Sequence, residues 1–506
     1  MLVRAALRRL PKSSSSKKAC ATVVSYPTRQ RSLLHSSAVV SKANTDYLDA
    51  THSDSSVPQD VQQLIDSFAQ VSLATYSRPP FIIVKGDKCT VWDSHGREYL
   101  DFSGGIAVNA LGHSDKGVQQ VMSDQSGVLV HNSNLYHNEW AGKLALKLAE
   151  TTKQFGGLGF EPAGHGNKVQ PTGLKVFFTN SGTESNEGAL KFVRKWGKLA
   201  QQSSGGNAKA AAPAMDANTD KVEIVSFRDG FHGRSLGALS ATWQEKYQAP
   251  FAPLLPGLKP ATLNDIDALQ TVITEKTCGV IVEPIQGEGG ILEATEEFLG
   301  ALRKRCDEVG ALLVFDEIQC GLGRTGSLWA HGSMPTDCHP DIVTMAKPLA
   351  NGFPIGAIMM KDKVADVIKI GDHGTTFGGG PLQTRIGHHV LSRIAEPEFL
   401  STVQKRSKHL LDRLNTLPDL FPRLVAGQPR GRGLIVGLPM ANDTYVQQVI
   451  KHSRERGLLL LSCGKSTVRF VPSLIVTDEE VERCCDILES VLVIMNQHAE
   501  GESRLV

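Results

Sequence analysis

The sequence predicts an α/β protein whose core is a mostly parallel sheet with helices on both faces. Short apolar runs bounded by Gly and Pro recur along the chain, and such runs are typical of buried parallel strands. Segments of helix length separate them, which indicates strand–helix–strand units. The expected strands are residues 176–179, 222–227, 280–283, 312–315 and 342–345.

Shorter elements are expected before this sheet. Residues 57–75 carry apolar side chains at helical spacing and predict one helix. Residues 81–84 and 91–92 predict short strands, with turns at 85–88 and 94–96. The N-terminal part of the folded chain is therefore expected to contain a helix followed by a small set of strands.

Two stretches and the C-terminal part differ from this pattern. Residues 154–171 and 201–220 are polar and lack periodicity, so we expect mobile surface insertions there. Beyond about residue 377 the pattern changes to helices, at 382–395 and 401–417, followed by a few strands. This change predicts a smaller α/β domain at the C-terminus.

The length of 506 residues is enough for more than one domain. We expect a targeting segment at 1–45, an N-terminal segment at 46–125, a large domain at 126–376 and a small domain at 377–506. No internal repeat interrupts this order.

The composition excludes several classes of protein. There are 54 basic and 52 acidic residues, so nothing indicates nucleic-acid binding. No apolar run approaches the ~20 residues that a membrane span needs. The nine cysteines show neither CxxC nor zinc-ligand spacing, which predicts reduced thiols, no metal site and an intracellular compartment.

The first 45 residues are basic. They contain no Asp or Glu and are rich in Ser, and their first ten residues could form a helix with one basic and one apolar face. This composition is typical of a mitochondrial or plastid transit peptide, and RSLLHSS resembles a mitochondrial processing site. The alternative is a basic tail without a targeting role. Because of the pattern that resembles a processing site, we expect the protein to be located in the mitochondrial matrix. The basic residues are Arg4, Arg8, Arg9, Lys12, Lys17, Lys18, Arg29, Arg31 and Lys42.

An acid and a lysine follow two of the expected strands. Asp316 ends the run LLVFD, and Lys347 follows the run IVTMA 31 residues later. Carboxyl ends of parallel strands are where open α/β sheets hold ligands. Pyridoxal 5'-phosphate chemistry needs a lysine for the Schiff base and an acid that keeps the pyridine nitrogen protonated. The alternative is a helix-capping acid and a surface lysine.

A strand-to-helix turn follows the first large-domain strand, in the sequence NSGTESNEGALK. Small residues at such a turn let backbone N–H groups point at an anion, and the helix dipole favours negative charge there. Gly182 and Thr183 are the expected phosphate ligands. The alternative is an ordinary N-cap turn, in which Thr183 or Ser185 caps the helix.

Two further segments place polar or aromatic side chains at the same sheet edge. RDGFHGRSLG supplies Phe231, whose ring could stack on a pyridine, and Arg234, which could bind a carboxylate. It also supplies His232. VEPIQGEGG supplies Glu283 at a strand end and Glu288 in a glycine-rich loop. Taken singly, each could instead be a core phenylalanine, a loop histidine or a solvated glutamate.

Together these segments resemble the class III aminotransferases of the ornithine/acetylornithine type. The resemblance rests on DEIQCGLGRTG, FHGR, VEPIQGEGG and the lysine 31 residues after the acid, and it extends from about Pro79 to the end of the small domain. WDSHGREYLDFSGGIAVNALGH and SNLYHNEWAGKLALKLAE are most similar to acetylornithine aminotransferases. The resemblance implies fold type I, with a seven-stranded sheet and a smaller domain built from the C-terminal part and the N-terminal segment.

The resemblance also implies roles for residues around the cofactor ring. Lys347 would form the Schiff base and carry the proton between substrate and cofactor carbons. Asp316 would pair with the pyridinium nitrogen, and Gln319 would approach the ring hydroxyl. Ile318 would pack against one face of the ring and Phe231 against the other.

Further implied roles concern the phosphate and the substrate. Gly182 and Thr183 would hold the phosphate, joined by Thr376 from a second subunit, which implies a homodimer with shared sites.

For the substrate, Arg469 would bind the carboxylate beside the reacting amino group of glutamate, and Arg234 the distal carboxylate. Glu288 would pair with Arg469 when the substrate has no nearby carboxylate, because an unpaired buried arginine is unfavourable.

Two segments depart from the family pattern. Relatives often have GHCHP where this chain has GHSDK, and GGNPLA where it has GGGPLQ, which places Gly380 at the asparagine position. Both changes are expected to affect local loop geometry and to remove no catalytic group.

The implied reaction moves the terminal amino group of N-acetylornithine to 2-oxoglutarate by a ping-pong mechanism, in arginine biosynthesis. The first alternative is ornithine or 4-aminobutyrate as amino donor, since the catalytic residues would be the same. A second alternative is a fold-type I decarboxylase or aminomutase, which would release carbon dioxide or turn over without a keto-acid acceptor.

Overall fold

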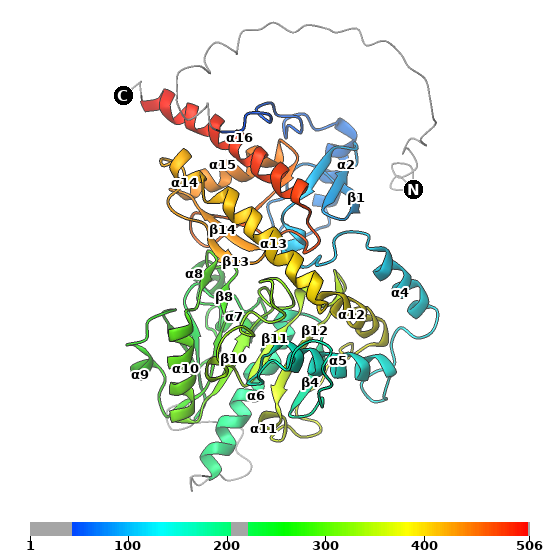
Figure 1. Cartoon of the computed structure of the whole chain (residues 1–506), viewed down its shortest axis with the longest axis vertical. Coiled ribbons are helices and arrows are strands. Elements are labelled where there is room, and N and C mark those ends of the chain that lie inside the picture. Colours follow the sequence, from blue (N-terminus) through cyan, green and yellow to red (C-terminus); the bar gives the residue numbers. More distant parts are fainter. Residues whose placement is uncertain (1–42, 204–220, 504–506) are drawn as a thin grey trace, which may run out of the picture. The chain divides into compact units, whose positions relative to one another are not determined.

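The computed structural model describes residues 43–203 and 221–503 (Figure 1). Most of the predicted targeting segment and residues 204–220 of the second predicted insertion lie outside this range. Residues from Ala43 onward form one compact unit, so the expected division at residues 126 and 377 stays a prediction. In the part of the chain that is described, every helix is too short or too polar to cross a bilayer.

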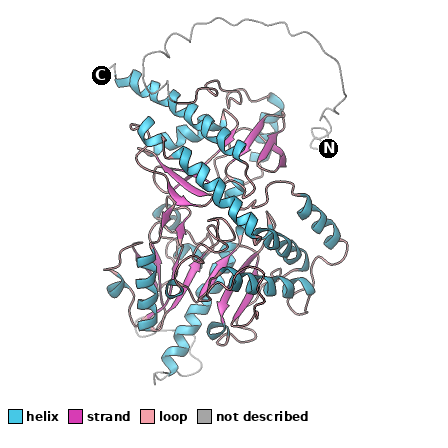
Figure 2. Ribbon diagram, in the orientation of Figure 1, coloured by secondary structure: helices cyan, strands magenta, loops and turns pink. Residues whose placement is uncertain are grey.

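A seven-stranded sheet forms the centre of the larger half of the molecule (Figure 2). Its order is β4-β12-β11-β10-β7-β5-β6, and only β12 runs antiparallel to its neighbours. The predicted mostly parallel α/β sheet is thus confirmed. The strands are β4 (Leu174–Thr179), β5 (Glu223–Phe227), β6 (Leu258–Ala261), β7 (Thr277–Val282), β10 (Leu312–Asp316), β11 (Ile342–Met345) and β12 (Gly356–Lys361).

The central strands are apolar throughout because helices cover both faces. Every residue of β7, β10 and β11 is buried. Val280, Leu313 and Phe315 face one core with helix α10 (Glu296–Val309). Their neighbours Ile281 and Val314 point to the opposite face and pack with helix α6 (Gly182–Ser203). The alternation follows from the two-residue repeat of a strand.

The smaller half contains an antiparallel sheet of order β13-β14-β17-β16. Its elements are β13 (Arg430–Arg432), β14 (Ile435–Pro439), β16 (Leu461–Cys463), β17 (Thr467–Phe470), α13 (Pro397–Leu414), α15 (Asp443–Arg454) and α16 (Asp478–Ser503). Strand β17 positions Arg469, a residue of the predicted site.

The N-terminal segment joins the C-terminal part through hydrogen bonds. A third sheet of order β1-β2-β3-β15 pairs β3 with the late strand β15, in parallel. Asn44 N–H also donates to Glu489 of α16 (2.9 Å). These strands are β1 (Ile83–Asp87), β2 (Thr90–Asp93), β3 (Glu98–Asp101) and β15 (Leu458–Leu459).

The remaining elements connect these sheets. They are α2 (Gln59–Ala69), α3 (Gly104–Ala107), α4 (Lys116–Ser126), α5 (Glu139–Phe155), α7 (Leu236–Ser240), α8 (Glu245–Gln248), α9 (Leu269–Val272), α11 (Asp362–Ala365), α12 (Pro381–Ile394), α14 (Leu417–Leu420), the hairpin β8 (Ile285–Gln286) and β9 (Leu292–Glu293), and the 3₁₀ turns η1 (Ala249–Phe251), η2 (Thr336–Cys338) and η3 (Lys347–Ala350).

Several boundaries differ from the expectation. The helix expected at 57–75 is shorter, because α2 ends at Ala69, and β1 continues through most of the turn expected at 85–88. The stretch 154–171 is not only a surface insertion. Leu158 is fully buried, and its N–H donates to His331 Nε2 (3.0 Å), whose other ring nitrogen contacts the buried Glu317 carboxylate. Burial of one apolar side chain outweighs the polar composition around it.

The first departure from the family pattern has a structural role. Asp115 of GHSDK caps α4, since its side chain accepts from Val118 N (2.9 Å), and it pairs with Arg393 of α12 (2.7 Å). Gly380, at the second departure, directly precedes α12 and its carbonyl accepts from Thr384 N.

Candidate active site

The two predicted catalytic residues lie at the carboxyl edge of the large sheet. Asp316 is the last residue of β10, and in the parallel pairing with β11 it stands opposite Thr344. Lys347 follows three residues later, at the first position of η3. Neighbouring parallel strands that end together bring the acid and the amine to one edge, as the sequence predicts.

Asp316 is held by a dense set of hydrogen bonds. His232 Nδ1 and Asn186 Nδ2 each donate to Oδ2 at 2.8 Å, and Ile318 N–H donates to Oδ1 at 3.1 Å. Thr344 Oγ1 in turn donates to Asn186 Oδ1 (2.8 Å). These side chains are buried, Ile318 only partly, so the orientation of the carboxylate is fixed.

His232 therefore acts as the partner of the acid. Burial alone would favour its neutral form, but the hydrogen bond and the charge of Asp316 raise the pKa of His232 above its ordinary value. The sequence places His232 at this sheet edge but assigns no role to it. It missed Asn186 and Thr344, although Asn186 lies four residues after Gly182 on the same helix face.

Lys347 carries an amine that loses its proton more easily than an ordinary lysine. Burial, together with the nearby Arg469, lowers the pKa of Lys347 to about 8, although Glu288, Glu283 and Asp316 oppose the shift. A lysine with a pKa near 8 keeps a large neutral fraction at neutral to mildly alkaline pH. That fraction is the nucleophilic form.

The start of α6 approaches the acid strand closely. A Cβ atom at Gly182 would lie 2.8 Å from Ile318 Cδ1, so a larger residue here would displace the Ile318 side chain. Thr183 Oγ1 lies 2.6 Å from Ser235 Oγ. Gly233, with φ of +137°, leaves room for Thr183, because a Cβ atom there would be 2.3 Å from Oγ1. The N-terminus of α6, with its dipole, lies at this turn, where the sequence predicts phosphate binding.

Arg469 forms the other end of the site. Its side chain is buried, and Nη1 donates to Glu288 Oε1 (2.7 Å). The same nitrogen donates to Gly287 O (2.8 Å) and to Gln319 Oε1 (3.0 Å). Among the described residues Nε has no partner. The predicted pair of Arg469 and Glu288 is thus formed, and Gln319 lies beside it.

Glu283 links two loops of the site. Its carboxylate accepts from Phe231 N–H (2.7 Å) and from Gly287 N–H (3.0 Å). Burial, together with the charge of Asp316, raises the pKa of Glu283 to about 7, although His232 opposes the shift. The sequence identified Glu283 only as a strand end. The sequence did not predict that its carboxylate connects two loops, one 52 residues before it and one 4 residues after it.

Two predicted residues lie apart from these contacts. Arg234 is exposed and stacks on Tyr247, with its Cζ 3.7 Å from the ring centroid. Thr376 is exposed on the loop before α12, and the neighbouring Thr375 Oγ1 accepts from Asn180 Nδ2 (2.9 Å).

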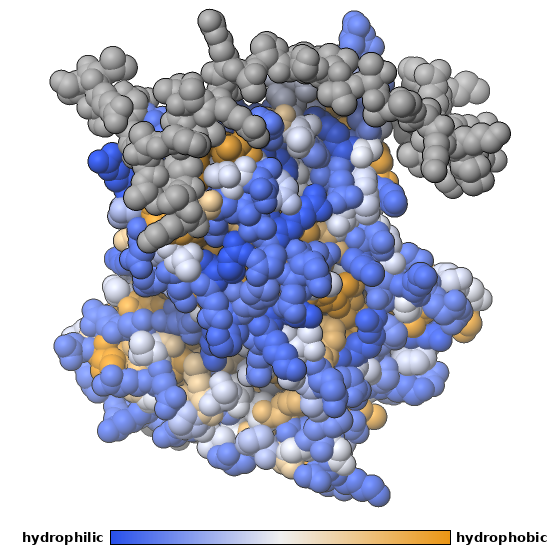
Figure 3. All heavy atoms as spheres, turned by 45° about the horizontal axis from the view of Figure 1, so that its top comes forward, coloured by the Kyte–Doolittle hydropathy of each residue, from blue (hydrophilic) through white to orange (hydrophobic). Residues whose placement is uncertain are grey.

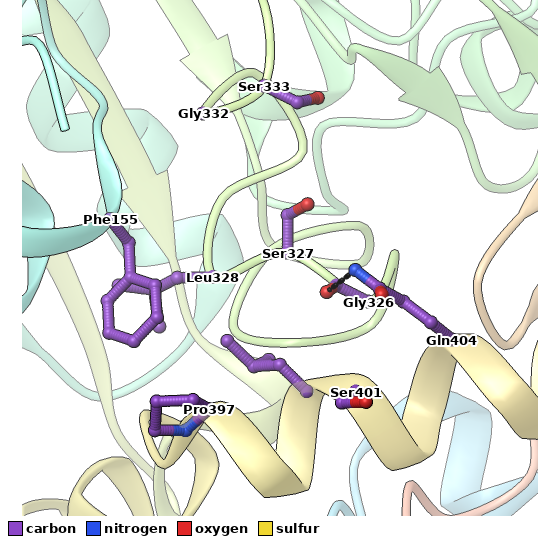
Figure 4. Close-up of a pocket in the computed structure, with 10 residues that line it drawn as sticks. Phe155, Gly326, Ser327, Leu328, Gly332, Ser333, Pro397, Ser401 and Gln404 are labelled. Atoms are coloured by element: carbon purple, nitrogen blue, oxygen red, sulfur yellow. Dashed lines mark hydrogen bonds between the residues drawn. The ribbon is translucent and has the colours of Figure 1, made fainter. Parts of the chain in front are cut away.

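A separate cavity of about 280 Å³ lies between the loop of residues 326–333 and α13 (Figure 4). Phe155, Leu328 and Pro397 line it together with small polar side chains, and it holds no ionisable group. It therefore lacks the groups needed for acid–base chemistry. The described residues also contain no cluster of three or more potential metal ligands.

Comparisons with known proteins show the family of this chain. Residues 72–492 match the family model described as aminotransferase class-III. The mitochondrial acetylornithine aminotransferase of Neurospora crassa is 48% identical over 439 residues, covering 87% of this chain and 89% of the relative. That of Saccharomyces cerevisiae is 42% identical over 426 residues, covering 83% and 93%.

Solved structures show the same fold. The ornithine aminotransferase of Toxoplasma gondii has a TM-score of 0.74 at 27% identity, covering 86% of this chain and 96% of its own. The N-acetylornithine aminotransferase of Stenotrophomonas maltophilia has a TM-score of 0.67 at 33% identity, covering 86% and 100%.

Proposed function

The chain belongs to the class-III aminotransferases, and we propose that it transfers the terminal amino group of N2-acetyl-L-ornithine to 2-oxoglutarate. The products are N-acetyl-L-glutamate 5-semialdehyde and L-glutamate. The names of the relatives from Neurospora crassa, Yarrowia lipolytica and Saccharomyces cerevisiae support this donor. The observation that carries the proposal is the Glu288–Arg469 pair, because it lets one site accept two different substrates.

The family implies pyridoxal 5'-phosphate as cofactor, and the residues present fit it. Gly182 lets the start of α6 approach Ile318, where a Cβ would lie 2.8 Å from Cδ1, and Lys347 offers an amine with a lowered pKa. Asp316 would pair with the pyridinium nitrogen. Ile318 would pack against one face of the ring and Phe231 against the other. When bound, the cofactor supplies an electron sink for the reacting carbon.

The protein residues would then control protons and charge. The neutral amine of Lys347 can accept a proton from the substrate carbon and would pass it to the cofactor carbon. A pKa of about 8 suits this role because it is close to the working pH. Asp316 stays oriented through its three hydrogen bonds. His232 donates one of these bonds and balances the buried negative charge.

Glu288 and Arg469 would distinguish the two half-reactions. The terminal amine of N-acetylornithine has no adjacent carboxylate, so Glu288 neutralises Arg469 while this donor is bound. 2-Oxoglutarate brings its own carboxylate, which replaces Glu288 on the guanidinium. Both half-reactions use one site, which requires a ping-pong order.

We also propose a homodimer that shares its sites through Thr376. Exposed apolar side chains in residues 128–136 adjoin this loop, since the rings of His131 and Phe377 are 5.5 Å apart and Asn134 Nδ2 donates to Thr375 O (3.1 Å). Exposed apolar side chains that lie near one another are typical of a surface that contacts another protein. The face in Figure 3 is mainly hydrophilic with separate hydrophobic areas. The exposed apolar residues are Val128, Leu129, Val130, Leu135, Tyr136 and Phe377.

Sedimentation velocity tests this assembly. Wild type should sediment as a dimer, and Phe377→Asp, which places a charge in the apolar patch, should shift it toward monomer with loss of cofactor. A monomeric wild type that retains cofactor would contradict the proposal.

The relatives from Neurospora crassa and Saccharomyces cerevisiae are named mitochondrial, and the basic, serine-rich N-terminus supports the same location for this chain. We therefore assign it to the mitochondrial matrix, with a role in arginine biosynthesis.

Rapid-mixing measurement of the first half-reaction tests the donor. The cofactor-loaded protein is mixed separately with N-acetylornithine, ornithine and 4-aminobutyrate, and the loss of the cofactor's visible absorbance is followed. N-acetylornithine should react with the highest specificity constant. A preference for ornithine or 4-aminobutyrate would keep the class and replace the donor, while release of carbon dioxide would refute transamination.

A further inference from the structure

The loop of residues 231–235 is fixed on both sides of Arg234. Its first backbone N–H donates to Glu283 Oε1 (2.7 Å), and Ser235 Oγ lies 2.6 Å from Thr183 Oγ1. The loop backbone therefore cannot shift without breaking contacts to two other elements. The side chain of Arg234 nevertheless projects into solvent from this rigid base.

Two aromatic rings restrict that side chain. Arg234 Cζ lies 3.7 Å from the centroid of the Tyr247 ring and 5.6 Å from that of Phe231. The two rings meet edge to face, with centroids 5.9 Å apart and an angle of 79°. Within residues 43–203 and 221–503 the guanidinium has no carboxylate partner. It is a cation that is held in place and still free to bind an anion.

The support of Tyr247 is itself anchored. Tyr247 lies on α8, and the flanking Gln244 donates from Nε2 to the carbonyls of residues 229 and 230 (3.1 and 3.3 Å). Gln248 donates from Nε2 to two carbonyls of α7 (3.0 and 3.2 Å). Two amide side chains thus hold a helix of four residues, which fixes the ring against which Arg234 packs.

Stacking determines which part of the guanidinium remains available. The ring covers a face, and the N–H groups point outward along the edge, where a carboxylate binds with two parallel hydrogen bonds. An exposed arginine without such support samples many rotamers and loses that freedom when a carboxylate binds. Tyr247 removes much of this loss before the substrate arrives.

We propose that Tyr247 is a positioning residue that sets the selectivity for amino donors with a carboxylate far from the reacting amine. It acts through Arg234 and has no contact with the reacting atoms. The inference rests on the proposed function, because it concerns the same site. It predicts a stronger effect on carboxylate-bearing donors than on plain amines.

The first experiment compares two donors in the half-reaction. N-acetylornithine carries the distal carboxylate, and N-acetyl-1,4-diaminobutane has the same chain, reactive amine and acetyl group without it. In Y247L the KM for N-acetylornithine should rise about three- to tenfold with kcat within about twofold, the range expected when a cation–π contact and a preset rotamer are lost. The specificity constant for N-acetyl-1,4-diaminobutane should not change.

Two variants serve as controls, and a third can replace Y247L. Y247F keeps the ring and should restore the wild-type KM. K246M removes the other cation near the same ring, whose Nζ is 4.7 Å from the centroid, and should leave both donors unaffected. Y247M replaces Y247L if the leucine variant has a lower thermal midpoint, since an unbranched side chain is more easily accommodated.

A binding measurement separates this inference from the identity of the donor. Glutarate is titrated calorimetrically into the cofactor-loaded protein, which needs no turnover. Y247L should weaken its Kd about three- to tenfold, and in an R234M background Y247L should cause no further weakening. If wild type fails to use N-acetylornithine but these glutarate results hold, the proposed donor is wrong and the role of Tyr247 stands.

Three results would overturn the inference. The first is an equal loss for both donors, which would mean a general structural role. The second is an unchanged glutarate Kd in folded Y247L or Y247M. The third is a full effect of Y247L in the R234M background, because Tyr247 would then act without the arginine.

Discussion

The two ends of the site are built differently. At the Asp316 end, every hydrogen bond to the carboxylate comes from a partly or fully buried partner, and Thr344 orients one of those partners. At the Arg469 end, the ion partner Glu288 is a loop residue with a side chain that is 20% exposed, and Nε of Arg469 is unpartnered among the described residues. One end is permanently satisfied, and the other has a partner that can be exchanged.

This difference matches the roles that we propose for the two ends. A group that orients one bound cofactor through a whole cycle gains from redundant hydrogen bonds, because they remove alternative orientations. A group that meets two substrates in turn needs a bond strong enough to neutralise it and weak enough to be replaced. Glu283 connects the ends, since it touches Phe231 on one side and Gly287 on the other.

The largest expected effect is loss of the amine between the two ends. Lys347→Ala should abolish turnover, a fall of about 10³-fold or more, because both the nucleophile and the proton carrier disappear. Steady-state assays and the visible spectrum of the purified protein measure it. Lys405→Ala, an exposed helix lysine of α13, is the control and should behave as wild type. Retained activity in the first variant would refute the role of Lys347.

The fixed end is tested by Asp316→Asn. The amide keeps the size of the side chain but not the charge, so cofactor should remain bound while kcat falls about 10²- to 10³-fold. Cofactor content and single-turnover rates separate the two effects. Near-normal chemistry would mean that the hydrogen-bond network around Asp316 serves stability alone.

The exchangeable end is tested by Glu288→Gln. The amide can still accept from Arg469 but cannot neutralise it, so the specificity constant for N-acetylornithine should fall about tenfold or more. The half-reaction with glutamate should change less than about threefold, because its carboxylate replaces Glu288. Glu293→Gln, which alters the pair with Arg432 (3.3 Å), is the matched control. Equal losses in both half-reactions would remove the proposed difference between the ends.

The smallest expected effect concerns pH. Because the folded protein lowers the pKa of Lys347 to about 8, the neutral amine of the cofactor-free protein increases about tenfold per pH unit below 8 and is nearly complete above 9. The rate of pyridoxal 5'-phosphate capture should follow this curve and level off. A rate that still rises toward pH 10.5 would show an ordinary lysine.

The pH dependence of the capture rate also tests whether Arg469 affects Lys347. Arg469 is one cause of the lowered pKa, so Arg469→Met should move the midpoint of the capture rate to higher pH. An unchanged midpoint would mean that burial alone controls the amine.

The match of residues 72–492 to the class-III family and the fold of the solved relatives confirm the recognition and the fold type I expected from DEIQCGLGRTG, FHGR and VEPIQGEGG. The five expected strands of the large sheet are all present, with ends shifted by at most a few residues. The sequence did not predict strands β6 and β12. The segment of β6, LKPA, contains a proline, and the segment of β12, GAIMMK, follows a turn with Gly and Pro and shows no alternation of polar and apolar residues.

The sequence by itself determined the sheet, the acid at one strand end and the lysine at the next, because strand period and the burial of apolar runs are local properties. Only the tertiary structure decided the partners of Asp316, Glu283 and Arg234. Asn186 meets Asp316 across 130 positions of sequence, and Glu283 meets Phe231 across 52. Tyr247 supports Arg234 through packing between a loop and a helix. Such contacts depend on how elements are placed in space, and no spacing in the chain encodes that placement.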